Sequence, residues 1–283
     1  MALFNRVTIV GLGLIGGSLG IAIRRKRLAR EVVGLSRDAS TLRRAKRRGA
    51  IDLGTTDAAR AVADADLVIL ATPVDTIIPY TRRLAPHMKL GSILTDVGST
   101  KAGIVQALER SLPAHIAFVG GHPLAGSEAR GIGAAVPHLF DGAVCILTPT
   151  ARTDRRALAR VRRLWTSVAS RVVTMSPAEH DRALAATSHL SHLVAACLTT
   201  SVPSAVCLHA APSFLDMTRL SKSDPGLWDD IFFSNAAATL AAMDRFDRRW
   251  HALRALLAGR RRRDLRRLLR DAKRRRDALK NGS

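Results

Sequence analysis

The sequence contains few of the features that would place it in several large classes of protein. Three cysteines (Cys145, Cys197 and Cys207) form neither a CxxC pair nor an even set, which excludes a disulfide framework. Reduced thiols in a cytoplasmic protein are therefore expected. No apolar run reaches the roughly 18 residues of a membrane span. The N-terminus also lacks the pattern of a signal peptide, so no membrane partner is expected.

Acidic and aromatic residues are also scarce. There are 23 Asp+Glu against 45 Lys+Arg, and the net charge of +22 makes a nucleic-acid partner the first hypothesis. Aromatic residues make up only 4% of the chain, with a single Tyr, which leaves little for base stacking. Only 7 of the basic residues are Lys, so Arg is favoured throughout, as a general compositional bias produces. Both observations argue against nucleic acid as the partner.

The 283 residues are enough for two domains, at roughly 150 residues each, and the hydrophobic fraction of 47% can supply a sizeable core. Short apolar runs alternate with helical segments over the first half of the chain, which predicts an α/β fold with a mostly parallel, Rossmann-type sheet. The runs are Arg6–Val10, Glu31–Leu35, Leu67–Ala71, Ser92–Asp96, Ala117–Gly120, Ala143–Thr148 and Arg171–Thr174. The helical segments include Leu14–Ala29, Ala39–Arg48 and Thr100–Arg110.

After about Ser176 the strand pattern stops, and the sequence predicts an all-helical second domain. Pro177–Thr200 and Leu227–Leu257 are Ala- and Leu-rich, with apolar residues on more than one helical face. Such helices need neighbours on each face, which favours pairing with a second subunit in a homodimer. Arg260–Lys280 keeps leucines at near-helical spacing and is expected to be a basic amphipathic helix. The predicted domains are residues 1–175 and 176–283.

A glycine-rich turn follows the first predicted strand and opens the first helix. The GxGxxG pattern is carried by Gly11, Gly13 and Gly16, with Leu14 and Ile15 between them. On its own this pattern is weak, but between a strand and a helix it indicates a dinucleotide site, with the pyrophosphate at the helix N-terminus. Thr72-Pro73, after the fourth predicted strand, could line the nicotinamide ribose, or serve only as a turn.

The residues at the end of the second strand select between the two nicotinamide cofactors. An NAD site usually has Asp or Glu there, to bind the ribose 2′-hydroxyl. Here the strand runs into Ser36 and Arg37, which could bind a 2′-phosphate, so NADP is the predicted cofactor. Asp38 keeps NAD open as the alternative, because one step of register would place an acid near the ribose.

Further polar segments follow the fifth and sixth predicted strands and recur in the helical half. They are DVGSTK (96–101), GGHPLAGSE (120–128), SHL (188–190) and DMTR (216–219). With GLGLIGGSLG (11–20) and the segment from Asp224-Pro225 to Trp228, they resemble the prephenate/arogenate dehydrogenase family of tyrosine biosynthesis over most of the chain. The resemblance implies a Rossmann domain and a helical dimerisation domain. It also implies oxidative decarboxylation of prephenate or arogenate to 4-hydroxyphenylpyruvate or tyrosine.

The resemblance assigns roles to residues of these segments. His122 matches the family's catalytic histidine, and its neutral imidazole could accept the substrate hydroxyl proton as hydride departs. Ser99 matches the serine that hydrogen-bonds the same hydroxyl, although it could also cap the helix expected near Thr100. Arg219 matches the arginine that binds a substrate carboxylate.

His189 matches the helical-domain histidine near the substrate, with a core histidine as the alternative. Glu128 and Asp216 match acidic positions that orient or gate the basic groups, and surface or capping acids are the alternative. His189 and His192 lie three residues apart, but no acidic residue accompanies them, so no metal site is expected. Because these residues come from both halves of the chain, we expect the site between the two domains.

The sequence departs from the family pattern at Ser191, Ser213 and Leu215, and these departures concern the substrate more than the reaction type. An amino analogue of prephenate is one alternative. Another two-domain Rossmann dehydrogenase, acting on a hydroxy or imino acid, is a second. A third is a non-enzymatic NADP-binding module that docks on nucleic acid through Arg260–Arg276.

Overall fold

A computed structural model describes residues 2–127, 129–169 and 171–280. The structure consists of two compact units, Met1–Ala236 and Ala237–Ser283. This division falls inside the predicted helical domain and does not decide the boundary near residue 176, which stays a prediction. No described helix is long and apolar enough to cross a membrane. All three cysteines are free; Cys145 is buried, and Cys197 and Cys207 are exposed.

The first unit is built around a six-stranded sheet in the order β3-β2-β1-β4-β5-β6, with every neighbouring pair parallel. This is the strand order of the Rossmann fold, so the predicted fold class is confirmed. The strands are β1 (Phe4–Val10), β2 (Ala29–Leu35), β3 (Leu53–Thr55), β4 (Leu67–Leu70), β5 (Ile93–Asp96) and β6 (Ala117–Val119).

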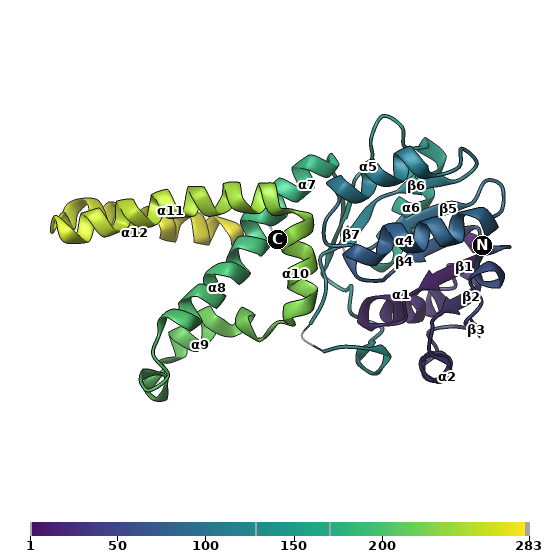
Figure 1. The fold of residues 1–283 in the computed structure, drawn as a ribbon, viewed down its shortest axis with the longest axis horizontal. Helices are drawn as coiled ribbons and strands as arrows, with labels where there is room; N and C mark the ends of the chain where they lie inside the picture. Colours follow the sequence, from purple (N-terminus) through teal and green to yellow (C-terminus); the bar gives the residue numbers. More distant parts are fainter. Residues whose placement is uncertain (1, 128, 170, 281–283) are drawn as a thin grey trace. The chain divides into compact units, whose positions relative to one another are not determined.

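Helices cover both faces of this sheet, because its central strands are apolar on both sides (Figure 1). One face packs against α1 (Leu14–Arg25), α2 (Ala39–Arg47) and α6 (Arg155–Val168). The other packs against α3 (Ala58–Val62), α4 (Val74–Leu84) and α5 (Ala102–Ser111). Short 3₁₀ turns, η1 (Ala85–His87) and η2 (Ile132–Ala134), join some of these elements.

A second, three-stranded sheet follows in the order β7-β8-β9. Its strands are β7 (Gly121–Pro123), β8 (Val144–Leu147) and β9 (Arg171–Thr174). The segment around His122 was predicted only as a polar segment after the sixth strand. In the structure it is the short strand β7, antiparallel to β8, with His122 opposite Ile146. This pairing fixes the backbone of His122 in a sheet and not in a free loop.

The rest of the first unit is helical. It contains α7 (Pro177–Leu184), the π-helical turn η3 (Ala185–His189), α8 (Leu190–Ser201), η4 (Val206–His209), α9 (Pro212–Thr218), η5 (Arg219–Lys222) and α10 (Pro225–Ser234). Helix α7 begins with a capping box, in which Ser176 and Glu179 bind each other's backbone N–H. The predicted helical segment at Pro177–Thr200 is confirmed, with the π turn inside it.

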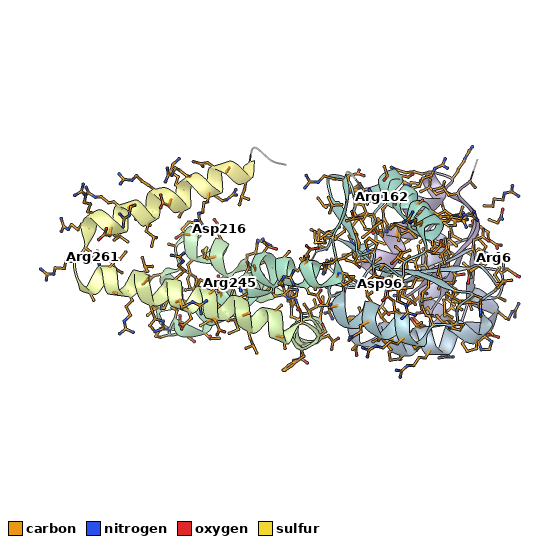
Figure 2. All side chains as sticks on the ribbon, turned by 90° about the horizontal axis from the view of Figure 1, so that it is seen from above. Arg6, Asp96, Arg162, Asp216, Arg245 and Arg261 are labelled. Atoms are coloured by element: carbon orange, nitrogen blue, oxygen red, sulfur yellow. The ribbon has the colours of Figure 1, made fainter. Side chains whose placement is uncertain are left out.

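The second unit is formed by α11 (Ala236–Ala258) and α12 (Arg262–Lys280). The helical pattern predicted over Leu227–Leu257 is confirmed, and it is divided between two helices, because α10 ends at Ser234 and a new helix begins at Ala236. The basic helix predicted at Arg260–Lys280 is confirmed as α12. Figure 2 shows nitrogen-tipped side chains along it, with Arg261 labelled at the turn that precedes it.

Candidate functional site

The glycine-rich turn between β1 and α1 fits a nicotinamide dinucleotide. Gly11 has a φ of +90°, and a Cβ there would lie 2.5 Å from the carbonyl oxygen of Ala71. A Cβ on Gly16 would lie 2.0 Å from the carbonyl oxygen of Gly11, so the helix packs directly on the turn. At Gly13, by contrast, a Cβ would meet nothing within 4 Å. No side chain caps α1, so open space and uncapped N–H groups meet at its first turn, which includes Leu14 and Ile15.

Three residues after the end of β2, the carboxylate of Asp38 binds backbone N–H groups. Its carboxylate caps α2 by accepting hydrogen bonds from the backbone N–H groups of Ser40 and Thr41. Side-chain and backbone hydrogen bonds from Ser40 and Thr41 hold the pKa of Asp38 well below its ordinary value. Ser36 accepts a hydrogen bond from the N–H of Asp38, and Arg37 is exposed. The acid that kept NAD open therefore has another function in this structure.

Thr72 and Pro73 follow β4 at the same edge of the sheet. Pro73 is the N-cap residue of α4. The hydroxyl of Thr72 is buried and has no hydrogen-bond partner within the described residues. A methyl carbon of Thr72 lies 2.9 Å from the Cβ position of Gly11, so this turn packs against the glycine turn. The two segments predicted to bind cofactor are thus neighbours.

The carboxylate of Asp96, at the end of β5, ties together the segments that carry Ser99 and His122. Its two oxygens accept hydrogen bonds from the N–H of Gly98, at 2.9 Å, and the N–H of Gly121, at 3.2 Å. Asp96 also pairs with the ammonium group of Lys101. Figure 2 labels Asp96 within the first unit. A single carboxylate therefore fixes the loop after β5 and the start of β7.

The Asp96–Lys101 ion pair is fully buried, with both side chains 0% exposed. Burying two charges is costly, but leaving one of them unpaired costs more, about 3–5 kcal/mol. The extra backbone hydrogen bonds to Asp96 satisfy its remaining acceptor positions. The pair is therefore a rigid support beneath His122, and its positive end faces that histidine.

His122 is partly buried, and its surroundings alter its acid–base properties. Its Nδ1 shares a hydrogen bond of 2.9 Å with Nε2 of His180, and this is the only side-chain hydrogen bond of His122 within the described residues. Burial, followed by the nearby His180, Lys101 and His189, holds the pKa of His122 well below its ordinary 6.5. A neutral imidazole at neutral pH can accept a proton.

His180 is itself held by the carboxylate of Asp181, at 2.8 Å between Nδ1 and Oδ1. Asp181 also accepts hydrogen bonds of 2.8 Å from the backbone N–H groups of Lys101 and Ala102. Burial raises the pKa of Asp181, but the hydrogen bonds from His180, Ala102 and Lys101 outweigh it and hold the pKa below its ordinary value. A continuous chain thus runs from the start of α5 through Asp181 and His180 to His122.

Ser99 lies in the loop between β5 and α5 and is partly buried. It is not the N-cap of α5, because that position belongs to Lys101, and the first N–H groups are bound by Asp181. The capping alternative for Ser99 is therefore wrong. No hydrogen bond joins Ser99 to His122 within the described residues. Among these residues, their segments are linked through Asp96 and through the chain from Lys101 to Asp181, His180 and His122.

His189 closes the turn η3 and is 1% exposed. Its Nδ1 lies 3.3 Å from the side-chain nitrogen of Asn235, and its ring meets the edges of Trp228 and Phe232. Burial, opposed by Asp181, lowers the pKa of His189 to about 4. Its neighbour His192 stacks on Trp228, with ring centroids 3.4 Å apart. His189 is a buried member of an aromatic cluster made by η3, α8 and α10.

Asp216 lies in the last turn of α9, and Arg219 is the first residue of η5. Both are exposed. Burial, with a smaller contribution from Arg219, lowers the pKa of His192, so this arginine lies near the aromatic cluster. Figure 2 labels Asp216. Glu128, the remaining predicted site residue, lies outside the residues that the structure describes.

The described residues of the predicted site all belong to the unit Met1–Ala236. Several of their partners were not predicted from the sequence, namely Asp96, Lys101, His180, Asp181, Trp228 and Asn235. Asp96 and Lys101 belong to the DVGSTK motif, and Trp228 to the segment that begins at Asp224, so only the roles of these three were missed. The His-Asp dipeptide at 180–181 has no spacing signal, because its partners lie about 58 and 80 residues away.

Two cavities of about 520 and 630 Å³ lie elsewhere in the first unit. The first is lined mainly by Arg24, Arg25, Arg27, Arg30, Arg47 and Arg48. The second lies between α5 and α6 and includes Glu109, His115 and Arg160. Neither contains a predicted site residue.

Comparison with known proteins was made at the levels of family, sequence and structure. The family model for the nucleotide-binding domain of prephenate dehydrogenase matches residues 19–174, and that for its dimerization domain matches 176–271. The chain is 36% identical to the prephenate dehydrogenase of Bacillus subtilis, over 86% of this chain and 67% of the relative. It is 37% identical to the cyclohexadienyl dehydrogenase of Zymomonas mobilis, over 91% of this chain and 90% of the relative.

Solved structures give the same result. The prephenate dehydrogenase from A. aeolicus, in complex with hydroxyphenyl propionate and NAD⁺, is similar with a TM-score of 0.91 and 34% identity, over 97% of this chain and 98% of that chain. The arogenate dehydrogenase from Synechocystis has a TM-score of 0.85 and 32% identity, over 97% and 99%.

Proposed function

The chain belongs to the prephenate dehydrogenase family, and from this premise we propose that it oxidises and decarboxylates prephenate or arogenate with NADP⁺. The products would be 4-hydroxyphenylpyruvate or tyrosine. The observation that carries the proposal beyond family membership is that Asp96 anchors both the loop after β5 and the start of β7. This carboxylate holds the segments of Ser99 and His122 to one end of the sheet, where α/β proteins bind ligands.

We propose that His122 is the general base. Its imidazole is neutral at neutral pH, because burial and the nearby His180, Lys101 and His189 hold its pKa well below the ordinary value. A neutral imidazole can take the proton of the substrate's ring hydroxyl as the carbon–oxygen double bond forms. The ring carboxylate then leaves as CO₂, and the electrons of the broken carbon–carbon bond complete the aromatic ring. Ser99 is proposed to hydrogen-bond the same hydroxyl and orient it toward His122.

The cofactor is proposed to lie on the glycine turn, with its pyrophosphate at the N-terminus of α1. The open position at Gly13 and the uncapped helix support this placement, together with Leu14 and Ile15 in the first turn. When bound, an oxidised nicotinamide dinucleotide supplies the hydride acceptor. Thr72 and Pro73 are proposed to border the nicotinamide half, because their turn packs against Gly11.

NADP is proposed over NAD because of the residues at the end of β2. Asp38 caps α2, whereas Ser36 and the exposed Arg37 remain near the expected 2′-phosphate. A guanidinium binds a phosphate with two parallel hydrogen bonds. The A. aeolicus relative is described with NAD⁺, so the comparison of KM values for NAD⁺ and NADP⁺ is decisive. A clear preference for NAD⁺ would overturn this part of the proposal.

Arg219 is proposed to bind a substrate carboxylate. Its exposed position beside the cluster of His192 and Trp228 supports this role. Because His189 is buried, we propose that it supports the wall of aromatic side chains on which the substrate rests. Asp216 and Glu128 are proposed to orient the basic groups.

The active protein is proposed to be a cytoplasmic homodimer, with a boundary between nucleotide and helical domains near residue 176. The second family model is described as a dimerization domain and begins at residue 176. Exposed apolar side chains on α11 support a subunit interface, among them Leu240, Phe246 and Trp250. Sedimentation equilibrium of the wild type and of Trp250→Glu tests this. A wild-type monomer at micromolar concentration would overturn it.

Initial rates with prephenate and arogenate, each with NAD⁺ and NADP⁺, test the proposed reaction. We expect reduction of the cofactor with at least one of the two substrates, faster with NADP⁺. An enzyme that reduces neither cofactor with either substrate would favour a different hydroxy-acid or imino-acid dehydrogenase. Turnover only with an amino analogue of prephenate would keep the reaction type and change the substrate, in line with the departures at Ser191, Ser213 and Leu215.

A further inference from the structure

We propose that Asp181 and His180 are positioning residues that set the tautomer of His122 and share the charge it acquires. The proposal rests on the proposed function, because it requires His122 to accept a proton during turnover. It concerns the residues behind the imidazole, on the side away from its Nε2. Their hydrogen bonds form one chain. The backbone N–H groups of Lys101 and Ala102 bind Asp181, Asp181 binds His180, and His180 binds His122.

The direction of this chain is determined at its carboxylate end. The pKa of Asp181 is held below its ordinary value, so at neutral pH the group is ionised and can only accept hydrogen bonds. Two of its acceptor positions are taken by the N–H groups of Lys101 and Ala102. Nδ1 of His180, 2.8 Å away, must therefore carry the proton and donate it. The Nε2 atom of a neutral His180 is then left with a lone pair.

That lone pair determines the state of His122. Nε2 of His180 lies 2.9 Å from Nδ1 of His122, and one of the two atoms must donate. Because Nε2 of neutral His180 can only accept, Nδ1 of His122 carries its proton. The Nε2 atom of His122 is then unprotonated, which is the state that a general base needs. The opposite tautomer would present an N–H to the substrate hydroxyl and could not remove its proton.

The hydrogen-bonded chain from Asp181 to His122 also stabilises the positive charge that His122 acquires. When the O–H bond of the substrate breaks, its proton moves to Nε2 of His122, and the bonding electrons form the C=O bond as hydride passes to the oxidised nicotinamide. The resulting imidazolium is partly buried, with Lys101 and His189 among the groups that disfavour a positive charge there. Asp181 is the carboxylate that faces this charge through His180. Hydrogen bonds along a chain strengthen when an end becomes charged, so His180 stabilises the proton on His122.

His180→Asn separates this role from a structural one. Asparagine can still reach Asp181 at the position of Nδ1, but it is too short to reach His122. We expect kcat to fall by about 10- to 100-fold, the scale found when a partner that orients a functional histidine is removed. KM and melting temperature should change little. The matched control is His87→Asn, an exposed histidine in η1, which should keep the wild-type kcat.

Nitrogen-15 NMR of the imidazole groups tests the tautomer directly, without substrate or turnover. In the wild-type protein we expect the proton of neutral His122 on Nδ1. Asp181→Asn removes the negative charge that fixes the proton of His180 on Nδ1, so we expect the proton of His122 to move from Nδ1 toward Nε2. The kcat of this variant should fall by about 10³-fold or more, in the range seen when a general-base histidine is held in the wrong tautomer.

The outcomes separate this proposal from the proposed function. A wild-type protein that shows no turnover with either substrate would overturn the function, while the NMR measurement would still decide the tautomer. Nε2-protonated His122 in the wild type would overturn the chain even if the enzyme is active. A wild-type kcat for His180→Asn would do the same. The expected tautomer together with a selective loss of kcat supports it.

Discussion

At position 122, local packing decides the chemistry of one imidazole. His122 lies on a strand, at the junction of a buried Asp96–Lys101 pair and the His180–Asp181 dipeptide. Removing charge from a half-buried ring in positive surroundings is favourable, which is why its pKa falls. A general base gains from this only if its free nitrogen faces the substrate.

His122→Asn tests the catalytic assignment. An amide cannot take the hydroxyl proton, so we expect turnover to fall by about 10²-fold or more, the usual scale for a lost acid–base group. The affinity for cofactor, measured by fluorescence titration, should be nearly unchanged, because the glycine turn lies on another loop. Wild-type turnover in this variant would falsify the assignment.

Arg219→Ala tests the proposed carboxylate contact. Loss of one charge-assisted hydrogen bond weakens substrate binding by about 1.5–3 kcal/mol, and we expect this mainly in KM. Arg219→Lys is the matched control, since it keeps the charge but loses the paired hydrogen bonds, and it should give an intermediate KM. If KM is the same in all three proteins, Arg219 does not contact the substrate.

At the scale of elements, periodicity predicted most strands and the helical segments, but it did not predict the point at Asn235 where one helix ends and the next begins. The apolar pattern of Leu227–Leu257 continues through Asn235 without interruption. In the structure Asn235 ends α10, and its side chain donates a hydrogen bond of 2.8 Å to the carbonyl of Asp181. A polar contact across 54 residues leaves no mark in a local pattern.

Short strands were missed for a different reason. Strand β3 has three residues with a partly exposed pattern, and β7 is Gly-His-Pro, with no apolar run. The site was predictable only in part for the same reason. The residues of its motifs could be named from the sequence, but the His180–Asp181 support depends on α7 packing beside α5.

The lowered pKa values of His189 in η3 and His122 in β7 predict a loss of stability in acid. The pKa of His189 is about 4 in the folded protein, against 6.5 ordinarily, and that of His122 is also lowered. Between about pH 6.5 and 4 the unfolded chain therefore binds protons that the folded chain does not, so stability falls as pH falls through this window. The pKa of Asp181 is lowered from its ordinary value of 3.8, so this carboxylate adds to the loss of stability only below about pH 3.8.

Urea unfolding at pH 7.5 and pH 5 measures this effect. We expect a lower midpoint at pH 5. Asp181 faces His189 and opposes its shift, whereas His180 and His192 add to it, so the effect belongs to the whole cluster. The exposed His87→Gln is the control and should leave the difference between the two midpoints unchanged. Equal midpoints at the two pH values would contradict the prediction.

At the scale of the whole molecule, the net charge of +22 remains larger than the proposed site requires. Arg37 and Arg219 account for two cationic groups. Much of the excess lies on α12 and in the cavity of about 520 Å³ lined by arginines. Docking on nucleic acid through Arg260–Arg276 stays a prediction. Repulsion between these charges acts whether or not such a partner exists.

The cavity lined by arginines is one place where repulsion between positive charges is expected. Arg24 pairs with Asp52, but Arg25, Arg27, Arg30 and Arg47 have no carboxylate partner within the described ranges. Raising NaCl from 0.1 to 1 M shortens the screening length from about 10 to 3 Å, so we expect the melting temperature to rise. The double variant Arg30→Gln/Arg47→Gln should melt higher than wild type in 0.1 M NaCl and gain less from added salt. Because both changes remove repulsion at one place, an equal gain in variant and wild type would show that this cluster is not its source.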